Sequence, residues 1–155
     1  MDGLKRIYAR NCEVRRIERA VAEPFLQSFH RLGYTRGRHL SGLFVSRGED
    51  IPEGTLVAVA GFSAPRVWRK GDLRIRSCEW IRYASLDGIG VDGGMGKLLK
   101  AFVEEVRPDD VMSYADASWS DGDVYRKLGF REESPKVFPD GSRSLKFRLK
   151  LTDYE

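Results

Sequence analysis

The sequence of 155 residues has few of the side chains that build metal centres and disulfides, with only two cysteines and two histidines. Cys12 and Cys78 do not stand at a metal-ligand spacing, and His30 and His39 complete no zinc pattern. We therefore expect no metal site. The two thiols are most simply reduced and buried in the core.

Long apolar runs are also missing. No stretch approaches the roughly 20 apolar residues that a membrane span needs, and residues 1–6 lack the apolar core of a secretion signal. The sequence therefore predicts a cytoplasmic protein. Its composition, with 41% hydrophobic and 32% charged residues, is that of a globular chain. Its length predicts a single domain over residues 1–155.

Positive charge is in modest excess. Lysine and arginine outnumber aspartate and glutamate by 27 to 23, which gives a formal net charge of +4. Such a balance permits an anionic partner without requiring one. The basic residues gather at 31–39 and in the region Arg66–Arg82. A solvated polar face and a phosphate-binding face both fit this pattern, and DNA is one candidate partner for the second region.

Strand and helix patterns alternate along the chain, which favours a mixed α/β fold. Glu23 and Pro24 predict the start of a helix, with Phe25, Leu26, Phe29 and Leu32 on its buried face and Gly33 as its stop. Residues 42–46 and 56–62 predict a hairpin. Further strands are expected at residues 7–17, 73–83, 111–115 and 145–151, and further helices at residues 95–106 and about 120–128.

A glycine-rich turn precedes the helix predicted at residues 95–106. Residues 87–96 contain five glycines, and four of them lie at Gly90, Gly93, Gly94 and Gly96. A glycine turn before a helix leaves several backbone amides pointing outward, and the helix dipole favours negative charge there. The turn is suited to a diphosphate, and Lys97 could add a positive charge. The alternative is an ordinary turn that caps a core helix.

A second feature follows downstream. Residues 125–130 read Tyr-Arg-Lys-Leu-Gly-Phe, after a predicted strand and short helix. In this order and separation, the two segments resemble the two signatures of the Gcn5-related N-acetyltransferases (GNAT). The resemblance implies a mixed, mostly antiparallel sheet with helices on both faces and a splayed cofactor cleft.

The same resemblance implies that the cofactor is acetyl-CoA or another acyl-CoA. The sequence departs from the family at Val91, where the family usually has glutamine or arginine. The residues that the resemblance assigns to the cofactor are Val91, Gly93, Gly94, Met95, Gly96 and Lys97.

A narrower resemblance covers most of the chain in short pieces. Residues 113–116, 118–122 and 125 are similar to the phage Mom proteins, and so are residues 29–34, residues 56–59 with Phe62, and residues 79–83. Mom proteins modify the exocyclic amine of adenine in DNA. The narrower resemblance thus implies that the acceptor is a base amine in DNA.

Acyl transfer from a thioester to an amine needs a polarised carbonyl, a place for the amine proton and an acid for the leaving thiolate. The resemblances make Tyr125 the candidate acid and Asp116 the group that orients or deprotonates the amine, with Tyr114 as a third catalytic candidate. Other roles fit as well, because Tyr125 could be a core aromatic and Asp116 a turn cap. The candidates for binding the substrate are His30, Glu79, Arg82, Ser118 and Trp119.

Three hypotheses remain open from the sequence. The first is a Mom-like enzyme that modifies a DNA base with an acyl-CoA-derived group. The second is an acetyl-CoA-dependent N-acetyltransferase of a small amine or a protein. The third is a non-catalytic DNA-binding module on a degenerate GNAT fold, for which Val91 is the main support.

Overall fold

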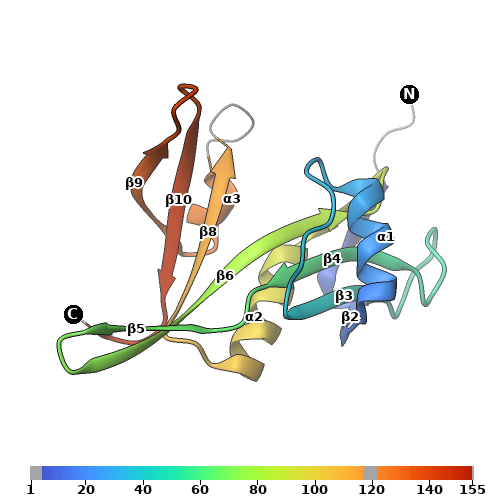
Figure 1. Cartoon of the computed structure of the whole chain (residues 1–155). Coiled ribbons are helices and arrows are strands. Elements are labelled where there is room, and N and C mark those ends of the chain that lie inside the picture. The colour runs from blue at the N-terminus through green and yellow to red at the C-terminus, as the bar shows by residue number, and fades with distance from the viewer. Residues whose placement is uncertain (1–4, 117–121, 155) are drawn as a thin grey trace. The chain divides into compact units, whose positions relative to one another are not determined.

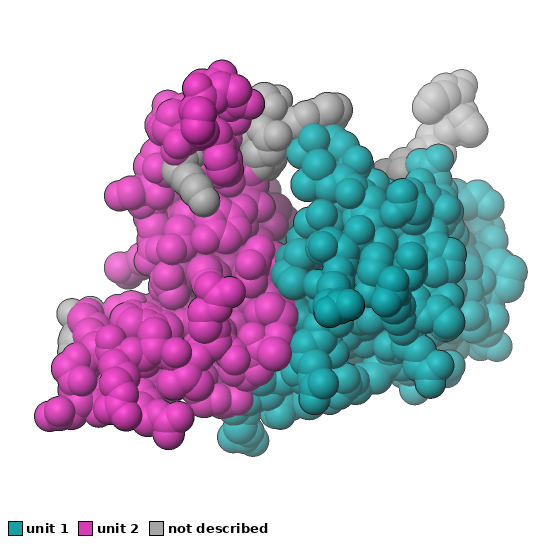
Figure 2. Space-filling model, in the orientation of Figure 1, with its two compact units in different colours: residues 1–62, 81–107 teal, residues 63–80, 108–155 magenta. Residues whose placement is uncertain are grey.

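The computed structural model describes residues 5–116 and 122–154, with only the backbone described for Asp116 and Lys136. The described chain forms two compact units (Figure 2). Unit 1 comprises residues 1–62 and 81–107, and unit 2 comprises residues 63–80 and 108–155. Strand β6 (Leu73–Ser85) contributes residues to both units. The prediction of a single domain over residues 1–155 stays a prediction.

Unit 1 contains two sheets. The larger has the strand order β2 (Cys12–Arg16), β3 (His39–Val45), β4 (Leu56–Phe62) and the end of β6. The smaller sheet is a parallel pair of β1 (Lys5–Tyr8) and β7 (Ile89–Asp92). The predicted hairpin is confirmed, because β3 pairs antiparallel with β4.

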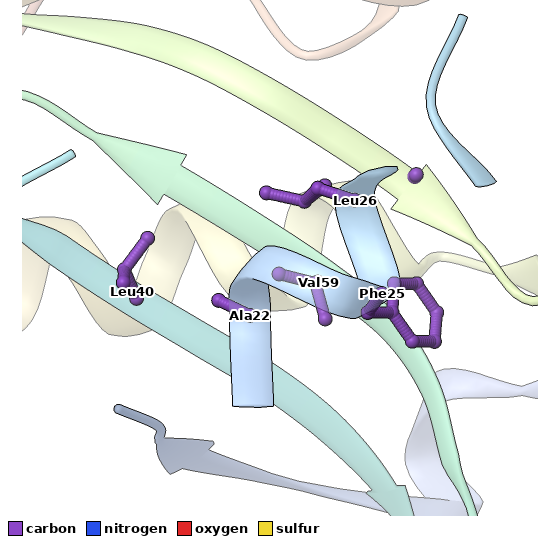
Figure 3. Close-up of a cluster of buried hydrophobic side chains, with 6 residues drawn as sticks. Ala22, Phe25, Leu26, Leu40 and Val59 are labelled. Atoms are coloured by element: carbon purple, nitrogen blue, oxygen red, sulfur yellow. The ribbon is translucent and has the colours of Figure 1, made fainter. Parts of the chain in front are cut away.

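The helices of unit 1 cover both faces of the larger sheet (Figure 1). Helix α1 (Arg19–Phe29) buries Ala22 and Leu26 against Leu40 and Val59 (Figure 3). Helix α2 (Gly94–Val106) lies on the opposite face. Its Phe102 stacks on Phe62, with ring centroids 3.9 Å apart. Val59 and Phe62 are three residues apart on β4, so their side chains point to opposite sides of the sheet, Val59 to α1 and Phe62 to α2.

Unit 2 is built around a second run of strands. Its order is β6, β8 (Asp110–Asp116), β10 (Arg143–Lys150) and β9 (Arg131–Val137), and β5 (Arg66–Lys70) pairs with β6. The β6–β8 pair is parallel, and its ladder runs from Ser77 and Asp110 to Trp80 and Ser113. The β10–β8, β10–β9 and β5–β6 pairs are antiparallel. The short helix α3 (Asp123–Lys127) follows β8. The predicted class, an α/β fold with a mixed and mostly antiparallel sheet, is confirmed.

Two predicted elements are wrong in extent. The strand expected at residues 7–17 is broken by the 3-10 turn η1 (Ala9–Asn11), whose Asn11 carbonyl accepts the amides of Ser46 and Arg47. The first helix starts at Arg19 rather than at Glu23, because the Glu18 carbonyl accepts the amides of Val21 and Ala22. Pro24 consequently lies inside the helix, which ends at Phe29, and Leu32 is 57% exposed rather than buried.

Three strands were not predicted. The basic region at 66–82 contains a further strand, β5, which pairs with the expected strand β6 through a turn at Gly71 with φ +64°. Strand β7 occupies part of the segment that the sequence suggested was all turn, and β9 precedes the last strand.

Candidate functional site

The glycine turn of unit 1 has a defined backbone geometry. Strand β7 leads into Gly93, which caps α2 with φ +80°, a left-handed conformation that favours glycine. Strand β1 lies alongside β7, with Tyr8 opposite Asp92, so both strands fix the direction in which the chain enters the helix. The prediction of a turn that opens directly into a helix at residues 93–96 is confirmed.

The first turn of α2 has backbone amides that lack an acceptor within the helix. The amide of Lys97 donates to the Gly93 carbonyl at 3.0 Å, and no side chain caps the helix. The amides of Gly94, Met95 and Gly96 lie before this first helical bond, so they have no acceptor within the helix. None of them donates to another residue in the described part of the chain. Such a group of amides is suited to an anion.

Gly94 also has a packing role. A Cβ atom there would lie 3.0 Å from the Tyr83 hydroxyl and 3.0 Å from Cγ1 of Val91. Val91 therefore contributes an apolar contact to the turn, where the GNAT resemblance implied a polar side chain. Burial raises the pKa of Tyr83 to about 12, so its phenol is protonated at neutral pH.

Lys97 does not extend freely from the turn. Its ammonium group donates to the carbonyls of Ala9 and Cys12, at 2.9 and 2.5 Å. Two of its three protons therefore hold the start of α2 against η1 and the first residue of β2, and one remains for another acceptor. A contact of Lys97 with a cofactor stays a prediction.

Tyr125 belongs to unit 2, where its ring is packed among aromatic side chains. It stacks on Phe147 and meets Trp80 and Phe130 edge to face. Its hydroxyl is 2.9 Å from Oγ of Ser113, which also lies 3.0 Å from the Trp80 carbonyl.

The single proton of Ser113 settles the direction of these two hydrogen bonds. A carbonyl only accepts, so Ser113 donates to Trp80 and accepts from the Tyr125 phenol. Burial raises the pKa of Tyr125, which keeps the phenol protonated at neutral pH. The arrangement suits a proton donor and also suits a core tyrosine.

The other catalytic candidates lie at the end of β8. Tyr114 is exposed, and its hydroxyl lies 4.0 Å from the sulfur of Met112. The backbone of Asp116 pairs with Ser144 of β10. The candidates Ser118 and Trp119 lie outside the described residues.

The structure brings together two of the substrate-binding candidates. In unit 1, Arg82 donates to the Gly33 carbonyl at 2.9 Å, just beyond the end of α1 where His30 lies. The amide of Leu32 donates to Nδ1 of His30. Burial, together with the charges of Arg82 and Arg31, lowers the pKa of His30 to about 4. His30 is therefore neutral at physiological pH, with its proton on Nε2.

Glu79 lies in unit 2 and its backbone is paired. Its amide donates to the Ser63 hydroxyl at 2.8 Å, and its carbonyl accepts the Ser63 amide. Its side chain is half-buried. No sequence pattern singles out Ser63, because a serine next to a strand is common in any fold.

Two cavities lie where the sequence suggested no site. Unit 1 has one of about 360 Å³ that borders β1 and η1. Unit 2 has one of about 620 Å³ between β9 and β10, lined by residues that include Arg131, Glu133 and Arg148. None of the predicted site residues lines either cavity, so they are separate features of each unit.

Within 5–116 and 122–154, no three His, Cys, Asp or Glu side chains are grouped as metal ligands. Cys12 and Cys78 are buried, and burial raises the pKa of Cys78 to about 11. No helix among the described residues is long and apolar enough to cross a membrane.

Comparison with known proteins identifies the fold. No protein-family profile matches the chain, and no curated protein sequence does. Among solved structures, mutant forms of the spermidine/spermine N-acetyltransferase SpeG from Vibrio cholerae match with a TM-score of 0.59 and 12% identity, over 90% of this chain and 94% of that one.

Two other acetyltransferase structures match. The GNAT domain of PAT from S. lividans gives a TM-score of 0.55 and 17% identity, over 89% of this chain and 90% of that one. The histone acetyltransferase HPA2 and related acetyltransferase from Corynebacterium glutamicum gives 0.50 and 16%, over 71% of this chain. The match spans only 62% of that chain. The chain therefore has the GNAT fold.

Proposed function

We propose that the chain is an acyl-CoA-dependent N-acyltransferase that uses acetyl-CoA or another acyl-CoA. The observation that carries this proposal is the uncapped start of α2, where the amides of residues 94–96 follow a left-handed glycine within a GNAT fold. The diphosphate of coenzyme A supplies the kind of anion that such amides bind.

In the proposed reaction, the acceptor amine attacks the thioester carbonyl. A C–N bond forms, the C–S bond breaks, and the thiolate leaves and takes up a proton. We assign that proton to the Tyr125 phenol, which burial keeps protonated, and the resulting phenolate regains a proton from solvent. Asp116 is proposed to accept or orient the proton of the amine. Tyr114, whose side chain is exposed, remains a second candidate donor.

Two acceptor classes are proposed. One is a small amine or a protein amine, as the name of the spermidine/spermine enzyme suggests for that protein. The other is an exocyclic amine of a DNA base, which the narrower sequence resemblance implies.

The two acceptor classes share the cofactor turn and differ in the acceptor that the protein has to bind. Burial, followed by the charges of Arg82 and Arg31, lowers the pKa of His30. His30 is therefore a neutral side chain next to two arginines, and it stays a candidate for binding either acceptor.

Acetyl-CoA binding tests the proposal most directly. Gly93→Asn and Gly93→Asp are a matched pair, because both side chains tolerate a left-handed backbone and serve at helix starts, and they differ by one negative charge. We expect Gly93→Asp to bind acetyl-CoA at least tenfold more weakly than Gly93→Asn in isothermal titration calorimetry. The difference should shrink as salt is raised.

Equal affinity of the two variants would show that no phosphate lies at the turn. Complete lack of acetyl-CoA binding by the unaltered protein, with retained binding to DNA, would favour the non-catalytic module instead. If acetyl-CoA binds, release of free coenzyme A with a panel of amines and with DNA, followed by mass analysis of the products, separates the two acceptor classes.

A further inference from the structure

The β5–β6 hairpin of unit 2 (Figure 1) is rich in basic residues that the proposed chemistry does not use. We define residues 66–77 as the ribbon. It has five cationic residues and one carboxylate, Asp72 in the turn. The cationic residues are Arg66, Arg69, Lys70, Arg74 and Arg76.

The strand register divides these residues between two faces. Residues directly opposite each other on antiparallel strands lie on the same face. Arg69 pairs with Arg74, and Val67 pairs with Arg76, so these four side chains share one face. We call it the arginine face.

The opposite face of the ribbon is held by unit 2. Ile75 and Ser77 are 1% and 2% exposed. The indole of Trp68 donates to the Ser77 hydroxyl at 2.7 Å, and its ring meets Tyr154 edge to face. These contacts hold the face of the ribbon that carries Trp68, Ile75 and Ser77 against unit 2. The arginine face therefore points to solvent, and Arg69 and Arg74 are exposed.

Four of the five cationic residues of the ribbon are not neutralised by the rest of the described chain. Arg66, Arg69, Lys70 and Arg74 form no ion pair with any described residue. The turn at Gly71 is open, since a Cβ atom there would meet nothing within 4 Å. Two arginines placed directly opposite each other disfavour the hairpin. Folding alone therefore gives no reason for this arrangement.

We infer that the arginine face binds the phosphate backbone of duplex DNA without reading its sequence. Guanidinium groups bind phosphate through paired hydrogen bonds. A two-stranded ribbon has the width that the major groove of B-form DNA admits, whereas the major groove of A-form RNA is deep and narrow. Use of this surface to hold an acceptor rests on the proposed acyltransferase, but the binding itself does not.

The test compares two charge-matched double variants of the full chain. Arg69→Gln/Arg74→Gln removes both central cations of the arginine face. Arg47→Gln/Lys100→Gln removes two exposed cations of unit 1 that also form no ion pair with a described residue. Binding to a fluorescent 20-base-pair duplex is followed by anisotropy over a series of salt concentrations.

We expect the arginine-face variant to bind at least tenfold more weakly at low salt. Its slope of log affinity against log salt should be smaller in magnitude by roughly 2, because each phosphate contact contributes about 0.9. The control variant should keep the slope of the unaltered protein. The arginine-face variant should also melt no lower than the unaltered protein, since a like-charge pair is removed.

An unchanged slope in the arginine-face variant, or an equal loss in the control, would overturn the inference. So would binding to anionic phosphatidylserine vesicles without binding to DNA. Acetyl-CoA titration of the same samples reports on the glycine turn separately, so failure of the acyltransferase proposal is distinguishable from failure of this one.

Discussion

A buried ion pair in unit 2 offers a sharp test of the structure. Asp110 begins β8 and is 0% exposed, and one of its carboxylate oxygens accepts from Arg148 at 2.9 Å and from the Tyr154 hydroxyl. The other oxygen has no partner among the described residues. Arg148 is itself 14% exposed and also donates to Glu133 at 2.8 Å.

Arg148→Met should strongly destabilise the protein because it leaves a buried carboxylate without its cation. Removing one partner of such a pair costs about 3–5 kcal/mol of the free energy of unfolding. The retained hydrogen bond from Tyr154 places the expected loss near the lower end, at about 3 kcal/mol. In a chain of this size, that corresponds to a fall in melting temperature of roughly 6–12 °C.

The control is a second substitution that removes the stranded charge. Asp110→Asn/Arg148→Met should be more stable than Arg148→Met alone, because an amide is cheaper to bury than a carboxylate. Urea unfolding followed by tryptophan fluorescence measures the effect where it occurs, since Trp68 and Trp80 both belong to unit 2. A loss of less than about 1 kcal/mol of unfolding free energy in Arg148→Met would refute the reasoning. So would a double variant whose loss equals the sum of the losses in Asp110→Asn and Arg148→Met.

Three further predictions address the candidate site. Gly93→Ala should lose about 1–2 kcal/mol of unfolding free energy in urea, because alanine does not favour φ +80°; an unaffected stability would contradict this backbone geometry. Tyr125→Phe should lower kcat by 10²–10⁴ with little change in the KM for acetyl-CoA if the phenol is the acid, whereas a kcat within threefold of the original would leave it a core residue. Lowering the pH from about 6.5 to 4 should destabilise the protein, because His30 takes up a proton in this range when the chain is unfolded but stays neutral in the folded protein, where its pKa is about 4. In His30→Gln the urea midpoint should fall less over the same range.

The sequence predicted best the elements whose local pattern and tertiary role agree. The apolar run of β4 and the periodic stripe of α2 came out as expected, because the burial of one face is visible in the sequence. The glycines at 93 and 94 likewise marked a turn before a helix. The position of the turn was therefore readable from the sequence.

The misses arise where distant residues decide the local structure. The break at residues 9–11 depends on hydrogen bonds from Lys97, Ser46 and Arg47, which no local pattern shows. The role of Lys97 itself was missed for the same reason. The hairpin at Gly71 was hidden because a run of arginines looks the same on one strand or two, and the cross-strand register that creates the arginine face exists only in the folded chain.

The pairing of β1 with β7 has a consequence for motion. It joins only four residues on each strand, and those residues are separated by more than 80 positions in the chain. A two-stranded sheet is only marginally stable on its own, so it can open without global unfolding. We therefore expect the amides of β7 to exchange with deuterium faster than those of β4. An anion held at the neighbouring helix start should slow that exchange in proportion to its affinity.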